Sequence, residues 1–217
     1  MVINLSSNNS LVNTWVSELR DVNVQNDRMR FRRNLERIAE VMAYEISKQF
    51  QYQETEIQTP LGLHNSNVLK QQPVLATILR AGLPMHNGML NYFDKADNAF
   101  ISAYRMHHRD GSFEINLEYV SCPSLDGRTI IISDPMLATG ASLVKTIAIL
   151  QSKWSIEKIY VVCAIASTVG IEFIKRECGN NIEIWCGDID DELTAKGYIV
   201  PGLGDAGDLA FGTKAQS

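Results

Sequence analysis

The stretch 128-RTIIISDPMLATGAS-142 joins an apolar run to an acid and then to a loop of small residues. The run has the composition of a buried parallel strand, and a helix is expected after the loop. Backbone N–H groups at the first turn of such a helix can bind an anion, and the helix dipole favours negative charge there. The stretch therefore predicts a phosphate site, with Thr139 and Ser142 as hydroxyl donors and Asp134 directed at a sugar hydroxyl. An ordinary capped turn is the alternative for this stretch taken alone.

Two common nucleotide-binding motifs do not fit the sequence. A Walker P-loop needs a lysine after its second glycine, and Ala141 follows Gly140 here. The segment 202-GLGDAG-207 spells the G-x-G-x-x-G of dinucleotide-binding proteins, but that motif must follow a strand and open a helix. We expect no helix or second strand in the ten residues after Gly207. The sequence thus argues against a nucleotide kinase and against a dinucleotide cofactor.

From Pro73 onward, apolar runs alternate with helical periodicity. The expected strands lie at 73–79, 158–166 and 182–187, and the expected helix at 170–177. The runs 99–104 and 113–120 flank the polar stretch 107-HHRDGS-112, which predicts a hairpin-like pair with a mobile tip. This alternation predicts an α/β fold in which helices flank a central, mainly parallel sheet.

The region from about residue 10 to residue 52 is predicted to be helical. Asn26 and Asp27 can cap a helix. Apolar residues then recur close to one helical face at Met29, Leu35, Ile38, Met42, Ile46 and Phe50. Between them lie Arg28, Arg30, Arg32, Arg33 and Arg37. We interpret these arginines as a solvated helix face or a subunit contact in preference to a phosphate site. The segment 59-TPLG-62 then predicts a turn.

Composition favours one globular domain over residues 1–217. The net charge of −5 argues against broad binding of nucleic acid or of a membrane surface. No apolar stretch approaches the roughly 20 residues of a membrane span, and the N-terminus lacks the pattern of a signal peptide, so a cytoplasmic protein is expected. Cys163 and Cys186 lie in expected strands, which favours buried reduced thiols over zinc ligands or disulfides.

Candidate substrate contacts follow the expected strands. In open α/β sheets, ligands bind beyond the carboxyl ends of the strands. Arg80 and Arg105 each follow such a run, and a guanidinium can form forked hydrogen bonds with phosphate oxygens. A surface salt bridge is the alternative role for either arginine. The sequence Arg-Ala-Gly after a buried run favours a site role for Arg80, whereas this criterion leaves Arg105 open.

Four stretches together resemble the uracil phosphoribosyltransferases, which belong to the type I phosphoribosyltransferases. The stretch 130-IIISDPMLATGAS-142 is similar to their loop for phosphoribosyl diphosphate, and a single acid followed by proline, as in Asp134-Pro135, is the variant of the uracil enzymes. The stretch 78-ILRAGLP-84 resembles the pyrophosphate loop, and Tyr104-Arg105 resembles the second diphosphate contact. The stretch 197-GYIVPGLGDAGDLAFGT-213 is similar to the uracil-binding segment. Two long motifs in the correct order make the resemblance specific.

The resemblance implies a type I phosphoribosyltransferase-like fold with N-terminal helices and a small hood or β-arm. It implies transfer of the 5-phosphoribosyl group from phosphoribosyl diphosphate to uracil, giving UMP and pyrophosphate in pyrimidine salvage. Mg²⁺ would be held through the diphosphate, the ribose hydroxyls and waters, with no dedicated protein cage. A homodimer or larger homo-oligomer is also implied, as is a GTP effector found in some relatives.

The same resemblance assigns roles to single residues. Phosphoribosyl diphosphate would contact Arg80, Arg105, Asp134, Pro135, Met136, Leu137, Ala138, Thr139, Gly140, Ala141, Ser142 and Asp205. Uracil would contact Ile199, Gly204, Asp205 and Ala206, mostly through backbone groups. Arg80 and Asp205 are the predicted catalytic residues, because Arg80 would stabilise the departing charge and Asp205 would lie near Mg²⁺ or its waters.

Two stretches depart from the family pattern, and some residues receive no chemical role. Residues 106–112 differ from the acid and threonine that relatives carry after Tyr-Arg, and Ser167-Thr168-Val169 stands where relatives tend to carry a proline-glutamate pair. His107 and His108 are interpreted as an exposed loop tip, because no third ligand lies at metal spacing. No function is assigned to His64 and His86, and a core position is assigned to Met85, Met89, Met136 and Trp185. The competing functions are transfer to orotate or a purine, and a regulatory or RNA-binding role on the same scaffold.

Overall fold

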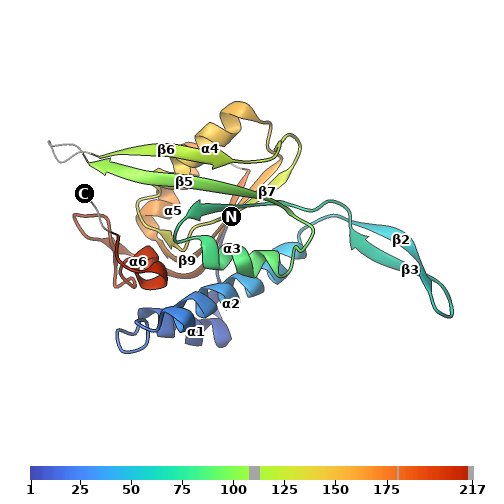
Figure 1. Cartoon of the computed structure of the whole chain (residues 1–217), viewed down its shortest axis with the longest axis horizontal. Coiled ribbons are helices and arrows are strands. Elements are labelled where there is room, and N and C mark those ends of the chain that lie inside the picture. Colours follow the sequence, from blue (N-terminus) through green and yellow to red (C-terminus); the bar gives the residue numbers. More distant parts are fainter. Residues whose placement is uncertain (108–112, 180, 215–217) are drawn as a thin grey trace.

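A mainly parallel sheet forms the centre of the molecule (Figure 1). The structure, a computed structural model, describes residues 1–107, 113–179 and 181–214. The eight-stranded sheet has the order β1-β10-β9-β7-β4-β5-β6, and β8 pairs with β9. Its strands are β1 (Val2–Asn4), β4 (Val74–Leu79), β5 (Asp97–His107), β6 (Phe113–Ser121), β7 (Thr129–Ser133), β8 (Met136–Leu137), β9 (Lys158–Ser167) and β10 (Ile182–Asp190). Within this sheet, every strand pair is parallel except β5 with β6, which confirms the predicted α/β fold.

Helices cover both faces of the sheet (Figure 1). One face carries α1 (Leu11–Arg20), α2 (Arg28–Ser47) and α3 (Leu83–Leu90), and the other carries α4 (Ala141–Lys153) and α5 (Thr168–Cys178). Side chains alternate between the two layers along each strand. Leu75 and Ile131 lie in the first core, whereas the next residues, Ala76 and Ile132, lie in the second. Both faces of the strands are therefore buried, which explains their continuous apolar runs.

The predicted cap and buried face of α2 are confirmed, with one exception. The Asp27 side chain accepts a hydrogen bond of 3.0 Å from a backbone N–H in the first turn. The expected residues Leu35, Ile38, Met42 and Ile46 are fully buried. The prediction is wrong for Met29, which is 65% exposed, because Phe31 sets the buried face and Met29 points to the opposite side two residues earlier. The helix ends at Ser47, before residue 52, although Phe50 still packs against the core.

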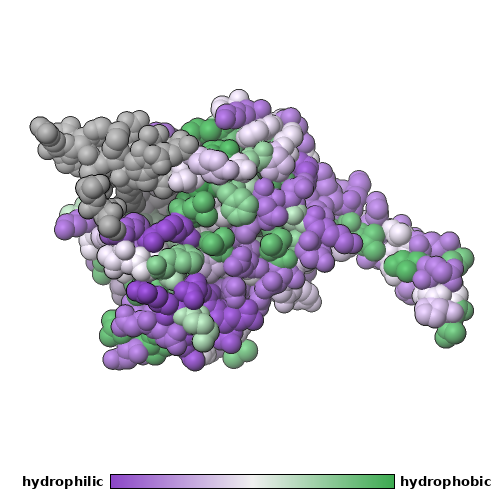
Figure 2. Space-filling model, viewed as in Figure 1, coloured by the Kyte–Doolittle hydropathy of each residue, from purple (hydrophilic) through white to green (hydrophobic). Residues whose placement is uncertain are grey.

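A two-stranded arm projects from the body of the molecule (Figure 1). β2 (Tyr52–Thr59) pairs antiparallel with β3 (Gly62–Leu69), and the predicted turn at residues 59–62 forms its tip. The residue pattern predicts the turn but not the strands, because most of their side chains are exposed and leave no apolar pattern. Only the family resemblance implies a hood or β-arm. Leu61 is 100% exposed and Leu63 is 64% exposed. The arm therefore presents apolar surface to its surroundings (Figure 2).

β5 and β6 form the predicted antiparallel pair. The expected mobile tip at residues 107–112 begins inside β5, because His107 still pairs with Phe113, so the loop position expected for His107 is wrong. The rest of the tip, including His108, lies outside the described residues. Arg105 lies inside β5, opposite Ile115, so the prediction that it follows a strand is wrong. The reason is that β5 pairs with β4 only over residues 97–102 and then continues, paired with β6, to His107.

Short elements occupy the two ends of the chain. They are η1 (Leu5–Ser7), β11 (Glu192–Leu193), β12 (Ile199–Val200) and α6 (Ala206–Phe211). The expectation that no helix forms near the C-terminal glycines is wrong. The Asp205 side chain caps α6 by accepting a hydrogen bond of 2.9 Å from the Asp208 N–H. α6 is too short for helical periodicity to reveal it.

The expected core residues and thiols are placed largely as predicted. Met85, Met89 and Trp185 are buried, whereas Met136 is half-buried within the phosphate loop. Cys163 and Cys186 are buried in β9 and β10, and all four cysteines carry free thiols. Burial raises the pKa of Cys186 to about 12, so this thiol is protonated at neutral pH. Among the described residues, no helix is long and apolar enough to cross a membrane.

Candidate active site

The carboxyl ends of the parallel strands meet at one edge of the sheet, on the side where α6 lies in Figure 1. Arg80 comes directly after β4, and Asp134 comes directly after β7. These two strands are neighbours, with Thr77 opposite Ser133. The structure therefore places two of the predicted site residues at adjacent strand ends, where open α/β sheets bind their ligands.

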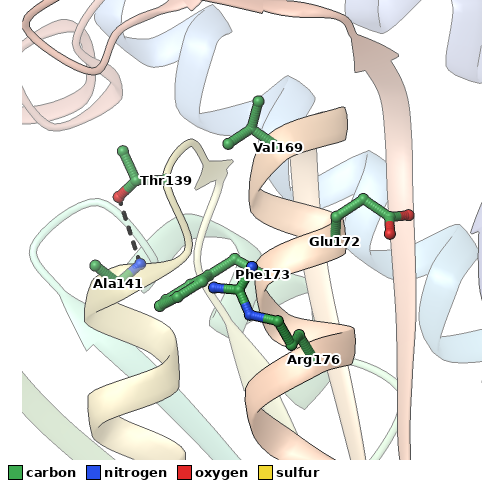
Figure 3. Close-up of a pocket in the computed structure, with 6 residues that line it drawn as sticks. All are labelled: Thr139, Ala141, Val169, Glu172, Phe173 and Arg176. Atoms are coloured by element: carbon green, nitrogen blue, oxygen red, sulfur yellow. Dashed lines mark hydrogen bonds between the residues drawn. The ribbon is translucent and has the colours of Figure 1, made fainter.

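The predicted phosphate loop leads from β7 into α4 through the two-residue strand β8. It surrounds a hollow of about 90 Å³ that is lined by Asp134 and residues 136–143. Gly140 stands at the N-cap with φ +76°, and it provides no side-chain cap for the first turn of α4. The Ala141 N–H lies 3.4 Å from Thr139 Oγ1 (Figure 3). The start of α4 can thus offer backbone N–H groups to an anion in the hollow.

Ser167 and Gly170 hold the phosphate loop in place from α5. The fully buried Ser167 hydroxyl donates to the Ala138 carbonyl oxygen and accepts a hydrogen bond of 2.9 Å from the Gly170 N–H. A Cβ at position 170 would collide with the same Ala138 carbonyl, so only glycine allows this close approach. Ser167 belongs to a stretch that departs from the family pattern, and here it both caps α5 and positions the loop.

A second hollow of about 390 Å³ lies between the start of α4 and α5 (Figure 3). Thr139 and Ala141 border it on one side, and Val169, Glu172 and Phe173 border it on the other. The Arg176 guanidinium lies 5.1 Å from the centre of the Phe173 ring, in cation–π contact. Thr139 and Ala141 also line the smaller hollow, so the two hollows border the same part of the phosphate loop.

Arg80 and the C-terminal segment meet in the structure. Arg80 Nη2 lies 3.1 Å from Asp208 Oδ1, and both Nη groups lie 3.3 Å from the Gly212 carbonyl oxygen. Asp205 Oδ1 caps α6, and Asp205 Oδ2 lies 3.8 Å from Lys214 Nζ. The predicted catalytic residues Arg80 and Asp205 are therefore brought to the same part of the site.

Gly82 fixes the loop that carries Arg80. A Cβ at position 82 would lie 2.8 Å from the Ile78 carbonyl oxygen and would collide with the Ser133 carbonyl and the Thr77 hydroxyl. Its φ of −71° is ordinary, so the need for glycine is one of space. The loop after β4 thus packs directly against the end of β7, next to the phosphate loop.

The predicted uracil contacts lie in a segment that offers backbone to a ligand. The side chains of Ile199 and Ala206 are buried in the core, so only their main-chain groups can face the site. Gly204 has φ +96°, and no described atom lies within 4 Å of the position of its missing Cβ. An exposed glycine backbone next to the buried Leu203 suits recognition of a small planar ring.

A charged network that the sequence analysis missed contacts this segment. Arg20, the last residue of α1, donates from Nη1 to Asp190 Oδ2 at 2.7 Å and to the Gly202 carbonyl at 3.0 Å. Its Nη2 donates to Asp188 Oδ2 and Asp190 Oδ1, both at 2.9 Å. Burial alone would lower the Arg20 pKa. The hydrogen bonds to Asp190 and Asp188 have the larger combined effect, so the Arg20 pKa is raised above its ordinary value. Asp188 and Asp190 follow the apolar run 182–187. A search for polar residues after the expected strands, which found Arg80 and Asp134, could therefore have found them as well.

The other arginines considered in the sequence occupy different positions. The structure gives the backbone position of Arg105 in β5, and its side chain is not among the described parts. Arg30 pairs with Glu18 on the helix surface, as expected for a solvated face. Arg32 instead donates to the Ala210 carbonyl at 2.7 Å and ties α2 to α6. No group of three His, Cys, Asp or Glu side chains that could hold a metal occurs within residues 1–107, 113–179 and 181–214.

Comparison with protein sequences shows one family over nearly the whole chain. A family model described as uracil phosphoribosyltransferase matches residues 6–213. A uracil phosphoribosyltransferase of Porphyromonas gingivalis is 49% identical over 213 residues, which cover 98% of this chain and 99% of the relative. One of Methanococcus maripaludis is 37% identical over 202 residues, which cover 91% of this chain and 84% of the relative.

Comparison with solved structures agrees with the fold. A protein from Aquifex aeolicus matches with a TM-score of 0.87 at 30% identity, and all of both chains is covered. A hypoxanthine phosphoribosyltransferase from Staphylococcus aureus matches with a TM-score of 0.52 at 15% identity, over 85% of this chain and 83% of that one. The second match shows the fold alone, and it confirms the predicted type I phosphoribosyltransferase fold.

Proposed function

Because this chain belongs to the uracil phosphoribosyltransferase family, we propose that it transfers the 5-phosphoribosyl group of phosphoribosyl diphosphate to uracil, giving UMP and pyrophosphate. One observation carries the proposal. Arg80 contacts Asp208 and Gly212, and its loop packs against the end of β7. The three segments that resemble the phosphate, diphosphate and uracil sites therefore lie together at one edge of the sheet.

The phosphate loop is proposed to hold the 5-phosphate of the donor. Its hollow of about 90 Å³ is lined by the backbone at the start of α4, where N–H groups and the helix dipole favour an anion. Thr139 and Ser142 add hydroxyl donors, and Asp134 at the mouth of the loop would accept from a ribose hydroxyl. By holding the 5-phosphate, the loop would restrict the position of the ribose next to Arg80 and the C-terminal segment.

Arg80 is proposed to stabilise the departing diphosphate. Bond breaking at the anomeric carbon moves negative charge onto the leaving oxygens, and a guanidinium placed there lowers the barrier. Arg80 is 41% exposed and is engaged by Asp208. Diphosphate oxygens would replace this carboxylate, because a forked interaction with phosphate is also charge-assisted. Arg105 in β5 would be the second diphosphate contact.

Mg²⁺ fits this edge of the sheet as an ion that arrives with the donor. The Asp205 carboxylate is 36% exposed and supplies hard oxygen ligands of the kind that Mg²⁺ prefers. Asp205 would hold the waters of the ion, and the diphosphate and ribose hydroxyls would supply the other ligands. When bound, the ion neutralises charge on the leaving group.

Uracil is proposed to be recognised by hydrogen bonds to backbone groups. Its edge presents two carbonyls and an N–H, which backbone groups at Ile199, Gly204, Asp205 and Ala206 can pair. Cytosine has an amino donor where uracil has a carbonyl, so a backbone donor would be left unpaired in the site. Leaving a buried polar group unpaired is how such a site would reject cytosine.

The test is an assay of the purified protein with phosphoribosyl diphosphate and Mg²⁺. Uracil, orotate, cytosine and hypoxanthine are supplied separately, and nucleotide formation is followed by chromatography. We expect UMP from uracil and no product from the other three bases. Nucleotide from another base, with none from uracil, would contradict the proposal.

The arm is proposed to contact a second copy of the chain in a homodimer or larger homo-oligomer. Its tip and sides carry exposed apolar residues, namely Tyr52 (48%), Ile57 (39%), Leu61 (100%) and Leu63 (64%). Exposed apolar patches of this kind mark interaction surfaces. We expect light scattering to give an oligomer for the wild type and a smaller species for Leu61→Glu with Leu63→Glu. Leu11→Glu, at a residue 68% exposed on α1, is the control. A wild-type monomer contradicts this part.

A GTP effector and a cytoplasmic location complete the proposal. The family resemblance is the support for GTP, and initial rates with and without GTP test it. The four free thiols support a reducing compartment, and cell fractionation tests the location. An unchanged rate at saturating GTP, or protein found outside the cytoplasm, contradicts the respective part.

A further inference from the structure

We propose that Arg20 and Asp190 are positioning residues that hold the nucleobase segment in its binding conformation. The inference rests on the proposed function, and it adds two side chains that contact the Gly202 backbone instead of a substrate. Arg20 ends α1 and Asp190 ends β10, and 170 residues separate them in the sequence.

Both polar groups of Gly202 are bound by this pair. The Gly202 N–H donates to Asp190 Oδ2 at 3.0 Å, and the Gly202 carbonyl accepts from Arg20 Nη1 at 3.0 Å. Arg20 Nη1 also donates to the same Asp190 Oδ2 at 2.7 Å, which closes a ring of three hydrogen bonds. Because two of these bonds involve the Gly202 backbone, the ring fixes the orientation of the backbone at that residue.

Gly202 sits where this orientation matters for the base. It lies three residues after Ile199 and two before Gly204, the residues whose backbone is proposed to read uracil. Gly202 has φ +56° and is buried, and a Cβ there would collide with the Ile199 carbonyl. A turn of this shape depends on glycine and on the hydrogen bonds that hold its ends.

Burial makes the network costly to break. The Arg20 side chain is 19% exposed and the Asp190 side chain is 7% exposed. Removing one member would leave a nearly buried charge and a backbone group without partners. α1 reaches this position because β10 has Gly187, where a Cβ would lie 3.1 Å from Val16 Cγ2 and 2.6 Å from the Ala164 carbonyl.

A comparison of Asp188 with Asp190 distinguishes a positioning role of the network from a merely structural one. Asp188 pairs with Arg20 at 2.9 Å and is 32% exposed, but its hydrogen bonds run to Arg20, Asn4 and Ile189 and none of them to Gly202. A general stabilising role predicts that loss of Asp188 and loss of Asp190 impair the enzyme in the same way. A positioning role predicts that only loss of Asp190 or Arg20 selectively weakens uracil binding.

Steady-state kinetics on both substrates test the inference, with melting temperatures recorded for each variant. Arg20→Gln and Asp190→Ala should each raise the uracil KM by about tenfold or more, while the KM for phosphoribosyl diphosphate stays close to wild type. Asp188→Ala should leave the uracil KM near wild type. Asp190→Asn keeps an acceptor for the Gly202 N–H and should partly restore the uracil KM. Arg128→Gln is the matched control, because it breaks another arginine–aspartate pair with a side chain 21% exposed, at the opposite end of β7.

The outcomes separate this inference from the proposed function. A wild-type enzyme that makes no UMP defeats the proposed function. An active wild type whose uracil KM is unchanged by Arg20→Gln and Asp190→Ala overturns the inference alone. Equal increases in both KM values, or equal effects of Asp188→Ala and Asp190→Ala, also overturn it. If Arg20→Gln does not fold, the comparison of Asp190→Ala with Asp190→Asn and Asp188→Ala still decides.

Discussion

Arg80 Nη2 lies 3.1 Å from Asp208 Oδ1, so an ion pair joins the end of β4 to the first turn of α6. The two side chains are 41% and 32% exposed. An exposed pair of this kind contributes about 1 kcal/mol or less to folding. The pair matters more for the proposed reaction, because Asp208 binds the Arg80 guanidinium to which the diphosphate is proposed to bind.

The first prediction concerns this pair. Arg80→Gln should lower kcat/KM for phosphoribosyl diphosphate by about 100-fold or more, since charge stabilisation of the leaving group is lost. Asp208→Asn should instead leave that value near wild type or raise it, and should shift Tm by no more than about 4 °C. Kinetics with varied donor, together with thermal melts, measure both effects. An Asp208→Asn loss as large as that of Arg80→Gln would show that Asp208 itself is needed for turnover.

The second prediction separates two roles of Asp205. Its Oδ1 caps α6, and its carboxylate is proposed to face Mg²⁺ and the substrates. Asp205→Ala should abolish turnover with the fold intact, at the loss of a cap that contributes about 1 kcal/mol. Asp205→Asn keeps the capping oxygen but removes the charge, so it should be nearly as inactive while melting like wild type. If Asp205→Asn is fully active, the role of the residue is the cap, and the assignment to the site is wrong.

The third prediction concerns the support of the phosphate loop. Ser167→Ala leaves the Ala138 carbonyl and the Gly170 N–H without their side-chain partner, which should cost about 1–3 kcal/mol of unfolding free energy. It should also raise the KM for phosphoribosyl diphosphate more than that for uracil. Ser152→Ala is the control, because this exposed serine on α4 donates to the Ile149 carbonyl at 2.8 Å, outside the loop. A Ser167→Ala enzyme with wild-type stability and KM values contradicts the proposed support.

The fourth prediction concerns pH and His86. This side chain is 2% exposed, and its ring centre lies 5.3 Å from that of Phe100. Burial lowers its pKa below the ordinary value, although a hydrogen bond with Asn98 acts to raise it, so the unfolded chain binds the proton more readily. The stability of the fold should therefore be retained above about pH 6.5 and be lost progressively as the pH falls towards the lowered pKa.

Urea denaturation at about pH 7.5 and about pH 5.5 measures this loss. His86→Leu removes the titrating group, so the variant should lose less unfolding free energy than wild type between the two pH values. His64→Leu, at an exposed histidine on β3, is the control for replacing a histidine. Identical losses in wild type and His86→Leu would remove His86 as the cause.

Short-range patterns suffice to predict the sheet and its phosphate loop. The strand at Thr129–Ser133 is a run of apolar residues, and Gly140 marks the entry into α4. Such signals depend on neighbours in sequence, and they place Asp134 and the loop correctly. Arg80 is predictable for the same reason, since it directly follows β4.

The parts that sequence patterns miss depend on distant contacts or on few residues. The strands of the arm are exposed and lack apolar alternation. α6 has six residues and depends on its Asp205 cap. Arg20 and Asp190 are 170 residues apart, so only the folded chain brings them to Gly202. The family resemblance covers the uracil segment itself, but not the side chains that hold it.

The position of β1 at the edge of the sheet has a consequence for biosynthesis. Val2–Asn4 is synthesised well before its partner β10, because the contact of Ile3 with Cys186 spans 183 residues. At about 5–20 residues per second, the first strand waits on the order of 10–40 s for the strand it pairs with. The same late segment supplies Asp190 and then the residues up to Lys214 that complete the site. A nascent chain that lacks these residues has neither a finished sheet edge nor a place for the base, so the proposed activity needs residues from both halves of the chain to be synthesised first.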